Sequence, residues 1–149
     1  MAKNFLWAGR KLKLKNLDFL REAFALAKQA HPDLSLEVGQ WSPEELEEKI
    51  KSSYALVLPS VSEVSPNLIN SAIRHSQPFI LTKETGLSER FKNLALLIDP
   101  LSVDNLKDKI IWLANQENYN QKQQELANFS FNHSWGNIAN EFIEIYKKI

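Results

Sequence analysis

The 149-residue chain contains no cysteine. A disulfide framework and a thiolate metal site are therefore excluded, and a reducing, cytoplasmic compartment is expected. Glycine is also scarce, with four residues, and no glycine-rich phosphate loop or Gly-x-Ser-x-Gly elbow occurs. These absences exclude the common nucleotide-binding loop motifs, cysteine nucleophiles and hydrolases of the nucleophile-elbow type.

Charge of one sign is not in excess, because 18 lysine and arginine residues balance 18 aspartate and glutamate residues. A neutral chain has no general attraction to nucleic acid or anionic lipid, so we expect no nucleic-acid partner. No apolar run approaches the ~18 residues of a membrane span, so none is expected. Residues 1–9 carry one positive charge and no long apolar run, which predicts that no signal peptide is present.

What the chain does contain is typical of a globular protein. Hydrophobic residues make up 44% of the sequence and charged residues 24%, so disorder is not expected. The length suits one hydrophobic core, and we expect a single domain spanning residues 1–149.

Five short apolar runs are separated by longer segments with helical periodicity. The runs Tyr54–Leu58, Phe79–Leu81 and Leu94–Ile98 have no polar alternation, which is typical of strands buried on both faces of a parallel sheet. The run Leu34–Val38 alternates and is expected in a more exposed strand. The first run is Phe5–Ala8.

The segments between and after these runs are predicted to be helices. Asn16, Ser42, Ser65, Ser102 and Ser134 stand where N-caps are expected, and Ser42 opens a capping box. The helical segments that we expect are Leu17–Ala30, Pro43–Ser52, a helix from Pro66 to before Pro78, Ser88–Lys92, Val103–Ala127 with a break near Asn118–Asn120, and Trp135–Lys148. Trp112 and Trp135 fall on apolar stripes and are expected in the core.

This alternation predicts the α/β class. Right-handed crossovers would place the strands in one parallel sheet with helices on both faces. We therefore expect a single Rossmann-like domain with about five parallel strands flanked by helices, followed by two C-terminal helices.

Ligands of such sheets bind where the strands end. One loop there carries Arg10 and Lys15, which can converge on a diphosphate, although a solvated basic turn is the alternative for Lys11 and Lys13. A second carries Glu63, just before a helix start whose backbone N–H groups favour an anion. The alternative for Glu63 is that it only complements the helix dipole. The histidines form no metal-binding pattern, so no metal site is expected.

Several short segments together resemble the C-terminal, donor-binding domain of family 4 glycosyltransferases of the GT-B fold. The family's "GR…KG", "PS…E", "EAMA.G.PVI", "GG..E" and "VDP" segments correspond to Gly9-Arg10-x-x-x-x-Lys15-Asn16, Leu58-Pro59-Ser60-x-x-Glu63-x-x-Pro66, Ala72–Ile80, Thr85-Gly86-x-x-Glu89 and Ile98-Asp99-Pro100. The motifs are individually weak, but they occur in order over nearly the whole chain.

The resemblance implies a retaining hexosyl transfer from a UDP-, GDP- or ADP-sugar, without a metal or other cofactor. Arg10 and Lys15 would hold the donor diphosphate. Glu63 would act as the catalytic residue that hydrogen-bonds the transferred sugar. The remaining nucleotide- and sugar-binding candidates are Ser60, Ser65, Asn67 and Ser71.

The sequence also departs from the family. Ser71 stands where the family has a glutamate that grips the ribose, and Ser76 replaces a glycine. The acceptor-binding N-terminal domain does not occur in these 149 residues. One interpretation is a donor-binding domain, inactive without an N-terminal domain or a separate partner chain. A second is a degenerate, non-catalytic domain used for binding or assembly. An exposed apolar face where the N-terminal domain would dock would indicate a fragment, and that face could also mediate self-association. A third is an unrelated nucleotide-binding α/β module.

Overall fold

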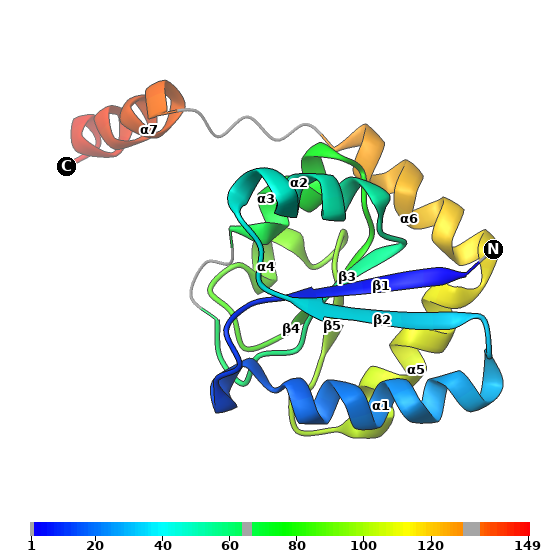
Figure 1. Ribbon diagram of the computed structural model, residues 1–149. Helices are drawn as coiled ribbons and strands as arrows, with labels where there is room; N and C mark the ends of the chain where they lie inside the picture. The colour runs from blue at the N-terminus through cyan, green and yellow to red at the C-terminus, as the bar shows by residue number, and fades with distance from the viewer. Residues whose placement is uncertain (1, 64–66, 130–134) are drawn as a thin grey trace.

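A computed structural model describes residues 2–63, 67–129 and 135–149. Its five strands form one parallel sheet in the order β2-β1-β3-β4-β5, which confirms the predicted α/β class (Figure 1). The strands are β1 (Lys3–Ala8), β2 (Leu34–Gly39), β3 (Ala55–Leu58), β4 (Phe79–Thr82) and β5 (Leu96–Ile98). The alternating strand β2 lies at an edge of the sheet, as its pattern indicated.

Helices cover both faces of the sheet in a Rossmann-like arrangement. Helices α1 and α5 pack on one face, while α2, α3 and α4 contribute to the core of the other. The helices are α1 (Leu17–Ala30), α2 (Pro43–Ser52), α3 (Leu68–Arg74), α4 (Ser88–Phe91), α5 (Val103–Ala114), α6 (Gln116–Asn128) and α7 (Trp135–Lys147). A short 3-10 turn, Lys13–Lys15, precedes α1.

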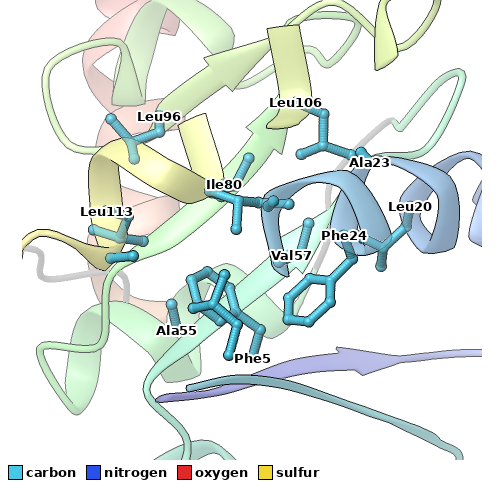
Figure 2. Packing of buried hydrophobic residues seen from close by; sticks show 14 of the residues in the cluster. Phe5, Leu20, Ala23, Phe24, Ala55, Val57, Ile80, Leu96, Leu106 and Leu113 are labelled. Carbon is cyan, nitrogen blue, oxygen red and sulfur yellow. The ribbon is translucent and has the colours of Figure 1, made fainter. Parts of the chain in front are cut away.

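Successive side chains of the inner strands point to opposite faces and build two cores. Phe5 of β1 and Val57 of β3 pack against Phe24 of α1 on one side (Figure 2), whereas Leu6 and Leu56 pack on the other. Each such buried side chain contributes roughly 1.5–3 kcal/mol relative to exposure. The period of two in the strands therefore explains why the sheet holds helices on both faces.

Helix α2 begins as its sequence predicts. The Ser42 hydroxyl accepts a hydrogen bond from the Glu45 backbone N–H at 3.3 Å, and the Glu45 carboxylate accepts one from the Ser42 N–H at 3.0 Å. Pro43 occupies the first helical position, where its missing N–H has no consequence. The capping box is confirmed.

The expected helix Val103–Ala127 is instead two helices, and the break lies at Asn115 rather than near Asn118–Asn120. The Asn115 side chain accepts hydrogen bonds from the backbone N–H groups of Glu117 at 2.9 Å and Asn118 at 3.3 Å, and so caps α6. Asparagine competes for backbone N–H groups in this way and favours a new helix start. Three described helices, α5 to α7, therefore follow β5 instead of two.

Helix α3 ends in a Schellman motif. The Gln77 N–H bonds to the Ala72 carbonyl at 2.8 Å, and the Ser76 N–H bonds to the Ile73 carbonyl at 3.1 Å. Ser76 has a φ of 51°, in the left-handed region that glycine usually occupies at this position. The start of this helix differs from the expected Pro66, since the described helix begins at Leu68, and Ser65 and Pro66 lie outside the described residues.

Helix α7 contributes no buried residue, and Figure 1 shows it standing apart from the sheet and its covering helices. Trp135 is 86% exposed, so its expected place in the core is wrong. The apolar stripe exists, but nothing in the described chain covers it. Ser134, the expected cap, lies outside the described residues. Across the described chain, no helix has the length and apolar character needed to cross a membrane.

Candidate functional site

The connections that leave β1 and β3 run in opposite directions from the centre of the sheet, toward β2 and β4 respectively. From β1 the chain crosses through α1 to β2 on one side, and it then returns through α2 to β3 on the other side. Sheets with this strand order bind ligands in the crevice at this switch point. A cavity of about 260 Å³ lies there, lined by Trp7, Ala8, Gly9, Lys15, Val57, Leu58, Ser60, Glu63, Asn67 and Leu68.

Three predicted site residues meet in this cavity. The Lys15 ammonium forms an ion pair with Oε1 of Glu63, and the Ser60 hydroxyl donates a hydrogen bond to the same oxygen at 2.8 Å. The Glu63 side chain is only 12% exposed, and Ser60 is buried. Asn67, also predicted, lines the same cavity. A cation and a carboxylate thus stand side by side, the first suited to a phosphate and the second to sugar hydroxyls.

Asn16 holds the loops around this cavity in place. Its side-chain amide donates to the carbonyl of Pro59, after β3, at 3.0 Å and to the carbonyl of Pro100, after β5, at 2.9 Å. Asn16 occupies the N-cap position of α1, as predicted, but its side chain makes no capping hydrogen bond and its backbone is left-handed, with φ 60°. Asparagine tolerates this conformation better than most residues, which frees the amide for the two loops.

The loop after β4 also meets Glu63. The Glu63 backbone N–H donates to the Glu84 carbonyl at 2.9 Å, and Glu63 pairs with Thr85 in an isolated parallel bridge. A second, wider cavity of about 430 Å³ lies between these loops, and Glu63 lines both cavities. The backbone contacts therefore fix Glu63 between two open spaces at the carboxyl edge of the sheet.

Other predicted residues of the described chain do not line the central cavity. Arg10 is exposed next to Gly9, and within the described residues its guanidinium has no hydrogen-bond or ion-pair partner. Lys11 and Lys13 line a separate cavity of about 350 Å³ with Arg21. Ser65 falls outside the described residues. Across the described chain, no group of three or more histidine, aspartate or glutamate side chains could hold a metal ion.

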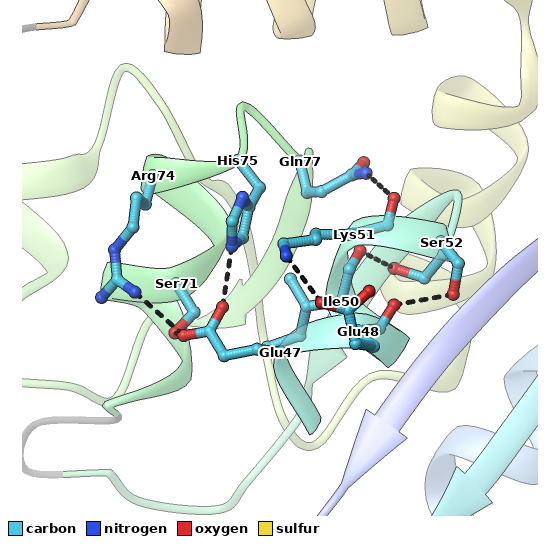
Figure 3. A network of polar contacts seen from close by, with 10 residues as sticks. Glu47, Glu48, Ile50, Lys51, Ser52, Ser71, Arg74, His75 and Gln77 are labelled. Atoms are coloured by element: carbon cyan, nitrogen blue, oxygen red, sulfur yellow. Dashed lines mark hydrogen bonds and ion pairs between the residues drawn. The ribbon is translucent and has the colours of Figure 1, made fainter. Parts of the chain in front are cut away.

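Ser71 lines a neighbouring cavity and contacts a residue that the sequence analysis missed. Its hydroxyl donates to Oε1 of Glu47 at 2.7 Å (Figure 3). Glu47 lies 24 residues earlier in the chain, on α2. In the sequence it is one of several glutamates of a charged helix, and no local pattern distinguishes it from its exposed neighbours.

No profile of a known protein family matches this sequence, and no curated protein sequence matches it either. Solved structures do match. The C-terminal domain of a group 1 glycosyltransferase, LpcC, from Francisella tularensis has a TM-score of 0.67 at 19% identity, over 84% of this chain and 82% of that domain. The catalytic domain of cholesterol-α-glucosyltransferase from Helicobacter pylori has a TM-score of 0.67 at 20% identity, over 85% and 96%.

A longer protein matches over part of its length. A mutant of S. aureus TarM in complex with UDP, fondaparinux and α-GlcNAc-glycerol has a TM-score of 0.76 at 13% identity. The match covers 97% of this chain but 35% of TarM, so this chain corresponds to about a third of that protein. At these identities the similarity concerns the fold. The chain has the fold of the C-terminal domain of a GT-B glycosyltransferase.

Proposed function

We propose that this domain binds a nucleotide-diphospho-sugar in the cavity between β1 and β3, as the donor-binding part of a retaining hexosyltransferase. The observation that carries the proposal is the meeting of Lys15, Ser60 and Glu63 at the switch point of the sheet. The fold supports it, since similar folds include TarM in complex with UDP and the pneumococcal O-GlcNAc transferase GtfA in complex with UDP and GlcNAc.

The donor diphosphate would lie against Lys15. The ammonium of Lys15 can make charge-assisted hydrogen bonds to phosphate oxygens. Such bonds are about twice as strong as hydrogen bonds between neutral groups. Arg10 follows Gly9 of the cavity wall and has no side-chain partner within the described residues, so it is available to close over the diphosphate. Together these cations would stabilise the negative charge that develops on the leaving diphosphate, a task that otherwise falls to a metal ion.

Glu63 would hold the sugar that is transferred. An ionised carboxylate only accepts hydrogen bonds, and sugar hydroxyls donate them. Ser60 and the backbone contact to Glu84 orient the carboxylate. Lys15 forms an ion pair with this carboxylate, and a diphosphate that binds to Lys15 would draw the ammonium away and release an oxygen of Glu63 for the sugar.

Transfer would require a second, acceptor-binding domain or partner chain. The apolar residues of α7 are exposed, with Phe142 at 69% and Ile145 at 58%. Leu12 and Leu14, on the basic loop beside the cavity, are exposed as well. Apolar groups in these positions fit a surface that another domain covers. We expect donor binding by this chain but no sugar transfer without that partner.

Thermal unfolding in the presence of UDP, GDP, ADP and their glucose or mannose conjugates tests whether the chain binds a nucleotide. A ligand at 100 times its dissociation constant adds about 2.7 kcal/mol of stability. For a chain of this size the melting temperature should rise by roughly 5–10 °C with the preferred nucleotide. In Arg10→Ala/Lys15→Ala the rise should disappear, because the diphosphate loses both cations.

The matched control is Lys11→Ala/Lys13→Ala, which removes the same charge from the same loop at two residues that do not line the central cavity. It should keep the full rise. An equal loss in both double variants would mean that only the general charge of the loop matters, and no rise with any nucleotide in the wild type would contradict the proposal.

The second candidate is a degenerate domain used for binding or assembly. The exposed apolar face of α7 favours it, because that face needs no nucleotide to act as a contact surface. Sedimentation of wild type and Phe142→Ser/Ile145→Ser distinguishes the two candidates. Self-association that this variant abolishes, together with no response to nucleotides, would favour the assembly domain.

A further inference from the structure

Helix α7 and the residues that follow it carry an apolar seam with the spacing of a coiled coil. Apolar residues recur at intervals of three and four, as the a and d positions of a heptad do. The seam residues are Trp135, Ile138, Phe142, Ile145 and Ile149. Ile138 is partly buried, and the others are between 58% and 99% exposed. Figure 1 shows the helix standing apart from the sheet, so the seam is open to a second helix.

The apolar surface of α7 is large enough for a dimer. Beside the seam residues Trp135 and Phe142 it includes Tyr146, which is 80% exposed. An aromatic side chain buries roughly 150–250 Å², so the aromatic residues of a helix pair would bury on the order of 900–1,500 Å². Stable protein interfaces begin at roughly 1,200 Å². Two copies of α7 therefore offer the apolar area that a dimer requires.

Two charged side chains of opposite sign flank the seam on one side. Glu141 and Lys148 are seven residues apart, so both occupy the g position beside the seam. Glu144 and Lys147 point away from the seam and pair with each other at 3.0 Å. Among the described residues, the side chains of Glu141 and Lys148 have no hydrogen-bond or ion-pair partner. These two charges are therefore available to a second helix.

The charges determine the direction of that second helix. When two such helices run antiparallel, their g positions lie beside each other. Glu141 of each copy then lies beside Lys148 of the other copy, and two ion pairs form about the two-fold axis. In a parallel pair the g positions face e positions, so Glu141 would lie beside Tyr146 and neither charge would be paired. Charge complementarity therefore favours the antiparallel pair.

The register that joins these charges also packs the apolar residues. It places Phe142 opposite Ile145 of the second copy, because a residues face d residues in an antiparallel pair. On the side of the seam away from the charges, it places Tyr146 beside Ala139 of the second copy. A large side chain thus lies beside a small one, which allows the two helices to pack closely. One register therefore satisfies the seam and both of its sides.

We propose that α7 joins two copies of this chain as an antiparallel helix pair, in which Glu141 of each copy binds Lys148 of the other. The contact uses the same surface on both copies and is closed, so it yields a dimer and not a filament. No residue of α7 lines the central cavity or the wider cavity beside it. The dimer goes beyond the proposed function and does not depend on nucleotide binding.

Sedimentation equilibrium of the full chain, at low salt and without nucleotide, measures the dimer affinity over a series of concentrations. Glu141→Lys replaces two attractive charge pairs of the dimer by two repulsive ones, so it should weaken the wild-type dimer roughly tenfold. Lys148→Glu should weaken it to a similar extent. An equimolar mixture of the two variants should regain the wild-type affinity, because each copy then offers the charge that the other lacks. A parallel pair predicts no such recovery.

The control is Glu144→Lys, which makes the same charge change on α7 away from the seam. It should alter the dimer affinity by no more than about twofold. A wild type that stays monomeric at millimolar concentration would overturn the proposal, as would a dimer that persists in Phe142→Ser/Ile145→Ser. A dimer that neither Glu141→Lys nor Lys148→Glu weakens would exclude the antiparallel register. Nucleotide binding is measured separately by thermal unfolding, so the proposed function can hold or fail independently of these results.

Discussion

Replacing Asn16 by alanine is expected to destabilise the protein by about 2–4 kcal/mol. The amide donates to two carbonyls, those of Pro59 and Pro100, and both proline residues are buried. Each buried acceptor that loses its only side-chain partner costs roughly 1–3 kcal/mol. Alanine also tolerates the left-handed backbone at φ 60° less well than asparagine. Urea unfolding measures the loss, and the melting temperature should fall by roughly 6–12 °C.

Two further variants separate the effect of the lost amide hydrogen bonds from the effect of the left-handed backbone. Asn16→Gly keeps the backbone conformation and removes only the amide, so it should be less destabilising than Asn16→Ala. Asn70→Ala replaces an exposed asparagine of α3 and should change stability by no more than about 0.5 kcal/mol. If the stability of Asn16→Ala differed from that of the wild type by no more than about 0.5 kcal/mol, the amide would not hold the loops together.

Replacing Glu63 by glutamine is expected to separate binding of the nucleotide from binding of the sugar. The variant loses the charge-assisted hydrogen bond to a sugar hydroxyl, so affinity for the nucleotide-sugar should fall roughly 10- to 100-fold. Affinity for the free nucleoside diphosphate should stay the same or rise, because Lys15 no longer pairs with a carboxylate. Calorimetry with the preferred nucleotide and with its sugar conjugate measures the ratio of the two affinities.

Glu89→Gln provides the control for this experiment. Glu89 lies on α4, is paired with Lys92 and lines neither cavity that Glu63 lines. It should leave both affinities unchanged. An equal fall in the affinity for the nucleotide and for its sugar conjugate in Glu63→Gln would assign Glu63 to the general architecture of the site instead of the sugar.

The fold was predictable from the sequence because its inner strands β3 and β4 are continuous apolar runs. Ala55–Leu58 and Phe79–Thr82 are buried at every position, and runs of this kind suit only the inner strands of a covered sheet. The break in the helical segment after β5 was predicted a few residues too late. Asn115 both ends α5 and caps α6, and an asparagine inside an otherwise helical pattern is a weak signal on its own.

The candidate site was predictable only in part. Lys15 lies in one predicted loop and Ser60 and Glu63 lie in another, and their common cavity follows from the neighbouring positions of β1 and β3 in the sheet. Glu47 could not be predicted, because its contact with Ser71 depends on how α2 and α3 pack. The hydrogen bonds of Asn16 to the two loops could not be predicted either, because an asparagine before a helix normally indicates a side-chain cap.

The most direct test of the central claim is to map nucleotide binding by amide chemical shifts in a nitrogen-15-labelled sample of the full chain. The claim is that a nucleoside diphosphate binds where β1 and β3 end. Titration with UDP, GDP and ADP should move the amides of Gly9, Lys15, Ser60 and Glu63 most with one of the three, and leave those around Phe142 of α7 unchanged. No shift with any nucleotide at millimolar concentration, or shifts confined to other surfaces, would contradict the account.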